Sequence, residues 1–280
     1  MLELISEQAC FGGVQRIYRH DSAAVKLPMR FGVFLPAQAR SAAVPAVFFL
    51  AGLTCNEETF AMKAGAQRKA AALGLILVTP DTSPRGAGVQ GEADSWDLGV
   101  GAGFYVDATE PAWSEHYRMH SYLLELRALV LAEFPVLNQA VGIMGHSMGG
   151  HGALVLALQH PDLFKSVSAL APICAPAQVP WGEKAFSAYF GARGPAWLDH
   201  DATALMTMRS KPFPQGILID QGLADKFLAE QLAPEAFEAA CAVAGQPLTL
   251  RRHATYDHSY YFIATFIDDH LDFHHEALAS

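Results

Sequence analysis

Short, mostly apolar runs recur along the chain and predict buried β-strands. They cover residues 44–50, 75–78, 141–144, 167–170, 217–220 and 248–250. Continuous apolar runs are typical of strands in a parallel sheet that is covered on both faces. Two earlier stretches, 15–20 and 29–35, alternate polar and apolar residues and therefore predict edge strands.

Helix-forming segments lie between these runs. They cover residues 56–73, 114–133, 153–158, 233–244 and 260–277. Asn56 is expected to cap the first helix, and Pro135 to end the second. Strands that alternate with helices predict an α/β fold, with a mostly parallel central sheet and helices on both faces, built as one domain of residues 1–280. A segment at about 171–211 is predicted to be loop-rich and to form a pocket wall.

One predicted strand runs directly into a glycine-rich turn. The turn reads Gly145-His146-Ser147-Met148-Gly149, which fits G-x-S-x-G, and a helix-forming run follows it. Strand, sharp turn and helix together predict that Ser147 is an exposed nucleophile. The two glycines lack Cβ atoms and let neighbouring backbone pass close by. The following helix directs its N-terminus at the serine, which favours negative charge there. The alternative, a glycine-rich turn with an incidental serine, is disfavoured by the flanking strand and helix.

A serine nucleophile needs a base and an orienting carboxylate, which follow it in the order acid, then histidine, in an α/β-hydrolase. Asp225 lies in the exit loop of the strand at 217–220 and is the preferred acid; Asp220, at the strand's end, is the alternative. His258 lies in the turn before the last helix and is the preferred base. The alternative is His253, which continues a strand, where a half-buried structural role is the default.

Two backbone N–H groups are needed to bind the oxyanion. Met148 follows the nucleophile and supplies one, and Leu53, in the loop after an early buried strand, is expected to supply the other. Cys55 lies beside this loop, either as a small buried hydrophobic residue or as a thiol that modulates the pocket. His146 and His151 are expected to pack around the nucleophile and not to act as the base.

Two further patterns resemble cofactor or metal sites without meeting their requirements. Residues 99–103 imitate a dinucleotide-binding loop, but the glycine spacing is wrong and no strand precedes them, so a pocket-wall turn is predicted. His270 and His274 are spaced i, i+4 but lack the glutamate of H-E-x-x-H, so a solvated helical face is predicted. No metal or cofactor is expected.

Composition narrows the possible partners. The net charge of −9 and the lack of basic runs argue against nucleic acid and against anionic membranes as partners. No apolar run approaches the roughly 20 residues that span a bilayer, and the first residues do not resemble a signal peptide. The four cysteines are scattered with no C-x-x-C pair, which favours a reducing cytoplasm.

Several blocks along nearly the whole chain resemble the S-formylglutathione hydrolase family, also called esterase D. These blocks are 50–55, 95–97, 101–109, 145–154, 180–186, 219–222, 225–228 and 256–266. The resemblance implies a cytosolic, cofactor-free, often dimeric α/β-hydrolase. Its substrate would be a thioester of glutathione, S-formylglutathione, which it cleaves to formate and glutathione through a formyl-serine intermediate in formaldehyde detoxification. A short-chain carboxylesterase of the same fold and a non-catalytic binding module are the alternatives.

The resemblance also assigns roles to individual residues. It carries over the catalytic triad and the oxyanion donors as Ser147, Asp225, His258, Leu53 and Met148. It further implies a substrate pocket lined by Trp96, Phe104, Trp181 and Cys55. The chain has Ala175 and Val179 where the family tends to carry Asn and a second Cys. That difference predicts a more apolar wall and bears on the preference for glutathione.

Overall fold

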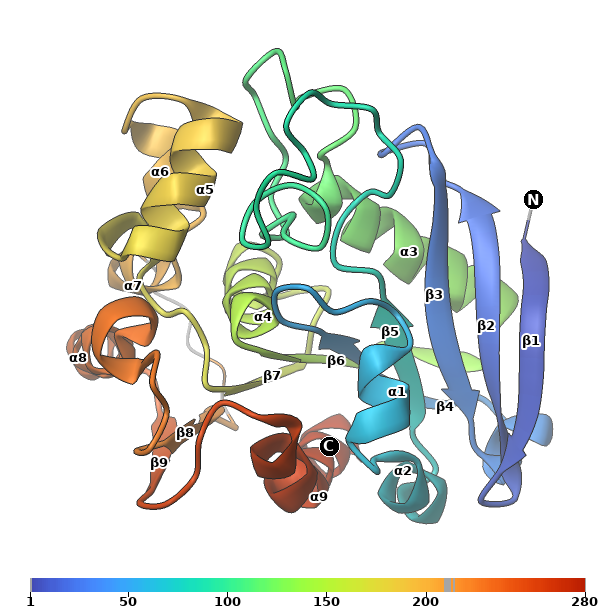
Figure 1. Ribbon diagram of the computed structural model, residues 1–280. Helices are drawn as coiled ribbons and strands as arrows, with labels where there is room; N and C mark the ends of the chain where they lie inside the picture. Colours follow the sequence, from blue (N-terminus) through green and yellow to red (C-terminus); the bar gives the residue numbers. More distant parts are fainter. Residues whose placement is uncertain (1, 209–212, 214, 280) are drawn as a thin grey trace.

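The computed structural model describes residues 2–208, 213 and 215–279. Within them, nine strands form one sheet in the order β1-β2-β3-β5-β4-β6-β7-β8-β9 (Figure 1). The strands are β1 Glu3–Cys10, β2 Gly13–Asp21, β3 Pro28–Leu35, β4 Val44–Leu50, β5 Ile76–Pro80, β6 Val136–His146, β7 Ser166–Leu170, β8 Ile217–Gly222 and β9 Leu248–His253. The pairings from β5 to β9 are parallel, and β1, β2 and β3 add an antiparallel edge. The mostly parallel central sheet with helices on both faces, predicted from the alternation of strands and helices, is confirmed.

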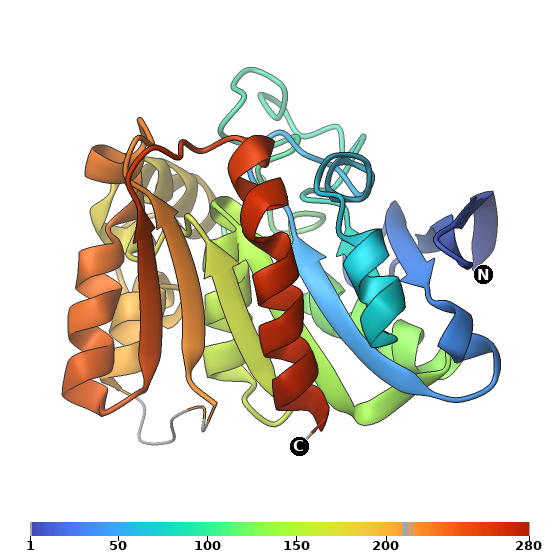
Figure 2. The same cartoon turned by 90° about the horizontal axis from the view of Figure 1, so that it is seen from below.

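Helices cover both faces of this sheet (Figure 2). They are α1 Thr59–Lys63, α2 Gln67–Leu73, α3 Met119–Glu133, α4 Met148–Gln159, α5 Pro180–Phe190, α6 Pro195–Asp199, α7 Ala202–Thr207, α8 Pro234–Ala244 and α9 Tyr260–Ala279. Alternate residues of β6 face opposite layers. A Cβ atom at Gly142 would meet His274 of α9, whereas one at Gly145 would meet Gly149 of α4. The core strands β5, β7 and β8 are buried at every residue, as their apolar sequences predict.

The structure corrects several predicted elements. Strand β1 was not predicted, because most of its residues are exposed on both faces and leave no apolar pattern to detect. The single helix expected over 56–73 is two helices, α1 and α2, separated at Gly65, where φ is 71°. Helix α3 begins at Met119 and not at residue 114. Asn56 accepts hydrogen bonds from the Glu58 and Thr59 amides in the turn before α1, close to the expected cap.

The segment at about 171–211 also differs from its prediction. Its described residues carry a 3₁₀ turn, Pro176–Gln178, and helices α5, α6 and α7, so they are mainly helical and not loop-rich. Residues 209–211 lie outside the described part of the chain. Prolines at the start of α5 and α6 favour helix initiation, because their missing N–H has no partner there in any case.

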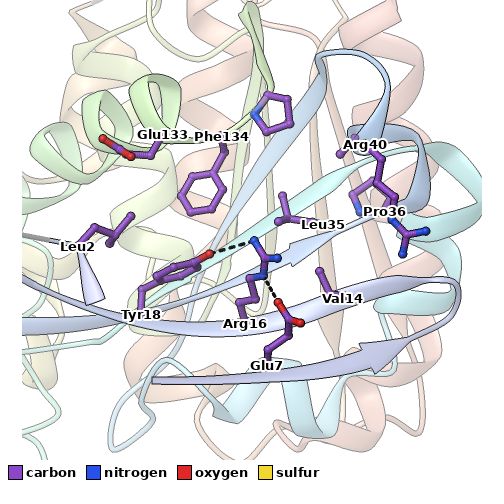
Figure 3. A pocket seen from close by; sticks show the side chains of 12 residues that line it. Leu2, Glu7, Val14, Arg16, Tyr18, Leu35, Pro36, Arg40, Glu133 and Phe134 are labelled. Atoms are coloured by element: carbon purple, nitrogen blue, oxygen red, sulfur yellow. Dashed lines mark hydrogen bonds and ion pairs between the residues drawn. The ribbon is translucent and has the colours of Figure 1, made fainter. Parts of the chain in front are cut away.

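The antiparallel edge and the end of α3 enclose a cavity of about 560 Å³ (Figure 3). Arg16 donates to Glu7 at 2.6 Å and to the Tyr18 hydroxyl at 3.2 Å within it. The charge of Arg16 is therefore compensated inside the edge sheet. This cavity shares no lining residue with the one at the G-x-S-x-G turn.

Candidate active site

Ser147 stands between the end of β6 and the start of α4. Its backbone has φ 57° and ψ −119°, a left-handed conformation that costs a non-glycine residue about 1–3 kcal/mol. Three hydrogen bonds hold it there: its N–H donates to Leu170, and its carbonyl accepts from His151 and Ile173. Ser147 therefore lies on the sharp, strained turn that the motif predicts.

The two motif glycines are required by close backbone contacts. A Cβ atom on Gly145 would lie 2.2 Å from the carbonyl oxygen of Gly149. One on Gly149 would lie 2.0 Å from the carbonyl oxygen of Leu50. Both distances are far below van der Waals contact, so the predicted reason for these glycines is confirmed.

Asp225 and His258 form a hydrogen-bonded pair. Asp225 Oδ2 lies 2.5 Å from His258 Nδ1, and Asp225 Oδ1 accepts from the Phe227 amide at 2.8 Å. The Asp225 side chain is fully buried, whereas that of His258 is 15% exposed. The carboxylate thus fixes the ring through Nδ1 and leaves Nε2 for another partner.

A cavity of about 310 Å³ brings most of the predicted site residues together. Its lining includes Ser147, His258, Leu53, Cys55, Trp96 and Trp181. Among the described residues, the Ser147 hydroxyl makes no hydrogen bond to the His258 ring. Catalytic hydrogen bonds are often long without substrate and tighten when it binds. The cavity therefore places a strained serine beside an imidazole whose other nitrogen is held by a carboxylate.

Asp220 has different partners. Its carboxylate accepts from Arg251 at 2.6 and 2.5 Å and lies 3.2 Å from His270 Nε2. Burial opposes the charge, but the hydrogen bonds from His270 and Arg251 outweigh it and hold the pKa of Asp220 below its usual value. His253 stacks on Phe266 with ring centroids 3.8 Å apart, in the half-buried structural position expected for it.

His270 and His274 face the sheet and not the solvent that was predicted. Both are fully buried, and they meet the hydroxyls of Ser166 and Ser168 on β7 at 2.6 to 2.9 Å. The prediction of a solvated face was wrong because α9 turns this face onto the sheet. Two serines in an otherwise apolar strand were the signal for polar partners. Within the described ranges, no cluster of three or more His, Cys, Asp or Glu side chains fits a metal ion.

The two histidines that flank Ser147, His146 at the end of β6 and His151 in α4, are buried and neutral. Burial lowers the pKa of His146 well below its ordinary value and that of His151 to about 3. His151 Nε2 lies 3.0 Å from the Phe104 carbonyl oxygen, which ties the ring to the loop beside α4. Their packing roles agree with the expectation for them.

The loop that carries Leu53 is held at several points. Tyr105 donates its hydroxyl proton to the Ala51 carbonyl at 2.8 Å, and Thr54 donates to Gly101. Thr82 and Arg85 both donate to the Cys55 carbonyl. In the described part of the chain, the amides of Leu53 and Met148 donate to no protein acceptor. Both remain available to a ligand oxygen.

Aromatic rings form one wall of the cavity. Trp181 packs edge-on against Trp96 at 5.6 Å and tilted against Phe227 at 4.6 Å. Phe227 in turn makes an edge contact with His258 at 5.0 Å. Phe227 was not among the residues predicted for this wall, although it lies two residues after Asp225 in the same loop.

Three predicted wall residues lie elsewhere. Phe104 is fully buried in the core, 6.1 Å from the His151 ring, and is not part of the cavity lining. Ala175 and Val179 are also buried and do not line it. Cys55 does line it, with Sγ 4.0 Å from the Tyr260 hydroxyl, and burial raises the pKa of its thiol. The protonated thiol is therefore favoured.

Comparisons with known proteins identify the family of the chain. Residues 22–273 match the esterase family described as "Putative esterase". The chain is 51% identical to S-formylglutathione hydrolase of Rattus norvegicus and 52% identical to that of Mus musculus, in each case over 98% of this chain and 97% of the relative. An S-formylglutathione hydrolase structure from Agrobacterium tumefaciens superimposes with a TM-score of 0.96 at 48% identity, covering 99% of both chains. The chain belongs to the S-formylglutathione hydrolase family.

More distant structures share the fold alone. The serine hydrolase FphF of Staphylococcus aureus has a TM-score of 0.76 at 20% identity, over 94% of this chain and 98% of that one. The overall fold is thus shared with more distant proteins, whereas family membership rests on the high-identity relatives.

Proposed function

We propose that the protein is a serine hydrolase that cleaves S-formylglutathione to formate and glutathione. The observation that carries the proposal is the hydrogen bond between Asp225 and His258, because the His258 ring lines one cavity with the strained Ser147 in a member of this family. Ser147 is the nucleophile, His258 the base and Asp225 the orienting acid.

Acylation begins when Ser147 Oγ attacks the thioester carbonyl carbon and its proton passes to His258 Nε2. Asp225, bonded to Nδ1, holds the required tautomer and stabilises the imidazolium. The tetrahedral intermediate collapses as the carbon–sulfur bond breaks. His258 then gives its proton to the departing glutathione thiolate. The enzyme remains as formyl-Ser147.

Deacylation uses the same groups in reverse. Water enters and gives a proton to His258, and its oxygen attacks the formyl carbon. The second tetrahedral intermediate breaks its bond to Ser147 Oγ, which recovers the proton from His258. Formic acid leaves and ionises to formate by releasing its proton to the solvent. In both steps the N–H groups of Leu53 and Met148 bind the oxyanion, where one donor is typically worth about 10²–10³ in kcat.

The cellular setting belongs to the same proposal. The reaction completes the glutathione route of formaldehyde detoxification, in the cytoplasm, with no cofactor and no nucleic-acid partner. Of the described helices, none has both the length and the apolar character of a membrane span. The chain acts as one catalytic domain, which the continuous nine-stranded sheet supports, and it associates as a homodimer.

Two measurements test this function. A serine-reactive phosphonate should form one adduct, located at Ser147 by peptide mapping; absence of the adduct would reject the enzyme assignment. The kcat/KM for S-formylglutathione should exceed that for an aryl acetate. A clear preference for the acetate would instead identify a short-chain carboxylesterase of the same fold.

A further inference from the structure

The cavity at Ser147 carries a positive charge on Lys63. Lys63 is the last residue of α1, is exposed, and places Nζ 5.6 Å from the centre of the Tyr260 ring, which lines the same cavity. Among the described lining residues, Lys63 alone carries a permanent charge, and no Asp or Glu is present. In the described part of the chain, no carboxylate lies within ion-pair distance of its ammonium group.

Nearby lysines differ from Lys63 in this respect. Lys184 of α5, close to Trp96, forms an ion pair with Asp97. Lys69 of α2 lies 2.7 Å from Asp272 of α9. Their charges are compensated locally, whereas the charge of Lys63 faces the cavity. In a chain with a net charge of −9, a local cation is needed to attract an anionic ligand.

The cavity volume also exceeds what the acyl group requires. A formyl group has two heavy atoms, whereas the cavity holds about 310 Å³, so most of it is available to the thiol portion of the substrate. Glutathione is a tripeptide whose two ends carry carboxylates, and its central cysteine bears the acyl group. When the thioester carbonyl carbon lies at Ser147 Oγ, a carboxylate at one end of the tripeptide can extend toward the cavity wall.

We infer that Lys63 binds a carboxylate of the glutathione portion. It thereby selects a thioester whose thiol portion carries carboxylates over an ester without charge. The inference rests on the proposed function and names the residue that recognises the thiol. The Tyr260 ring, through a cation–π contact, keeps the ammonium group over the cavity without neutralising it. The aromatic wall at Trp181 and Phe227 accepts the less polar parts of the substrate.

The test compares the wild type with Lys63→Met, Lys63→Arg and the matched control Lys26→Met. Lys26 is also exposed, lies outside the cavity at 4.0 Å from Glu115, and its replacement changes the net charge by the same amount. The kcat/KM values for S-formylglutathione and for an aryl acetate are measured at about 50 mM and about 500 mM NaCl. Thermal unfolding of each variant checks that the fold is retained.

Lys63→Met should lower the kcat/KM for S-formylglutathione, divided by the kcat/KM for the aryl acetate, about fivefold, mainly because KM for the thioester rises. Lys63→Arg should restore most of that ratio, and Lys26→Met should leave it unchanged. High salt should reduce the ratio in the wild type and in these two variants, which keep a cation at position 63, but not in Lys63→Met. An unchanged ratio in a folded Lys63→Met, or equal losses for both substrates, would overturn the inference. A wild type that does not hydrolyse S-formylglutathione would instead reject the proposed function.

Discussion

The imidazole of His146 lies against that of His258, with ring centroids 4.4 Å apart and planes tilted by 46°. His146 is buried and neutral, because burial lowers its pKa far below the ordinary value. A charged ring at this distance would oppose formation of the His258 imidazolium that the mechanism requires. A neutral neighbour packs the base without competing for its proton.

Replacement of His146 by leucine should therefore leave the acid limb of the kcat/KM profile with the same single ionisation as the wild type. Leucine keeps most of the packed volume and removes a ring that burial keeps neutral, because burial lowers the pKa of His146 well below its ordinary value. The profile is measured with S-formylglutathione across that range. Loss of an ionisation in the variant would mean that His146 itself titrates in the active enzyme.

Asp225→Asn should lower kcat by about 10⁴, the loss seen when a triad aspartate no longer fixes the histidine tautomer in a serine protease. Asp220→Asn should act mainly on stability, because Asp220 bonds Arg251 and His270 and does not touch His258. Steady-state kinetics and urea unfolding of both variants separate the two effects. A larger loss of kcat in Asp220→Asn would show that the acid is misassigned.

Tyr105→Phe should lower kcat by roughly tenfold for thioester and ester alike. The hydroxyl of Tyr105 donates to the Ala51 carbonyl, and a buried carbonyl without a donor costs about 1–3 kcal/mol. The oxyanion loop that follows Ala51 would shift, and both substrates need the same oxyanion donor at Leu53. A loss confined to S-formylglutathione would contradict this explanation and implicate Tyr105 in thiol binding.

Stability should fall in acid because of buried neutral histidines, of which His151 and His274 are two. Burial lowers the pKa of His151 and of His274 to about 3, against an ordinary value of 6.5. Below pH 6.5 the unfolded chain binds protons that the folded chain cannot, so stability falls as pH decreases towards 3. Each histidine contributes a slope of about 1.4 kcal/mol per pH unit in that window.

Urea unfolding at a series of pH values between about 7 and 4 measures this slope. His274→Gln removes one of the two histidines. It should therefore reduce the slope of the free energy of unfolding against pH by about half of what His151 and His274 contribute together. A variant with the wild-type slope would show that other groups cause the acid loss.

Local patterns were sufficient for much of the fold. The apolar sequence of β7 or β8 predicts burial on both faces wherever the strand is placed. Gly145 and Gly149 predict a sharp turn, although the close contact of Gly149 is with Leu50 of the distant strand β4. Chain order was enough to propose Asp225 and His258. Strand β1 has no such pattern, because an exposed edge strand is defined by its partner β2 and not by its own side chains.

The chain by itself determined which residue types were available for acyl transfer and in which order they follow the serine. Only the tertiary structure decided that Asp225 and not Asp220 contacts His258, that His270 and His274 face the sheet, and that Phe227 and Lys63 belong to the cavity. The physical reason is that a local apolar run is enough to predict that a strand is buried on both faces. The partner of a carboxylate, an imidazole or an ammonium group is set by segments far away in sequence that packing brings together.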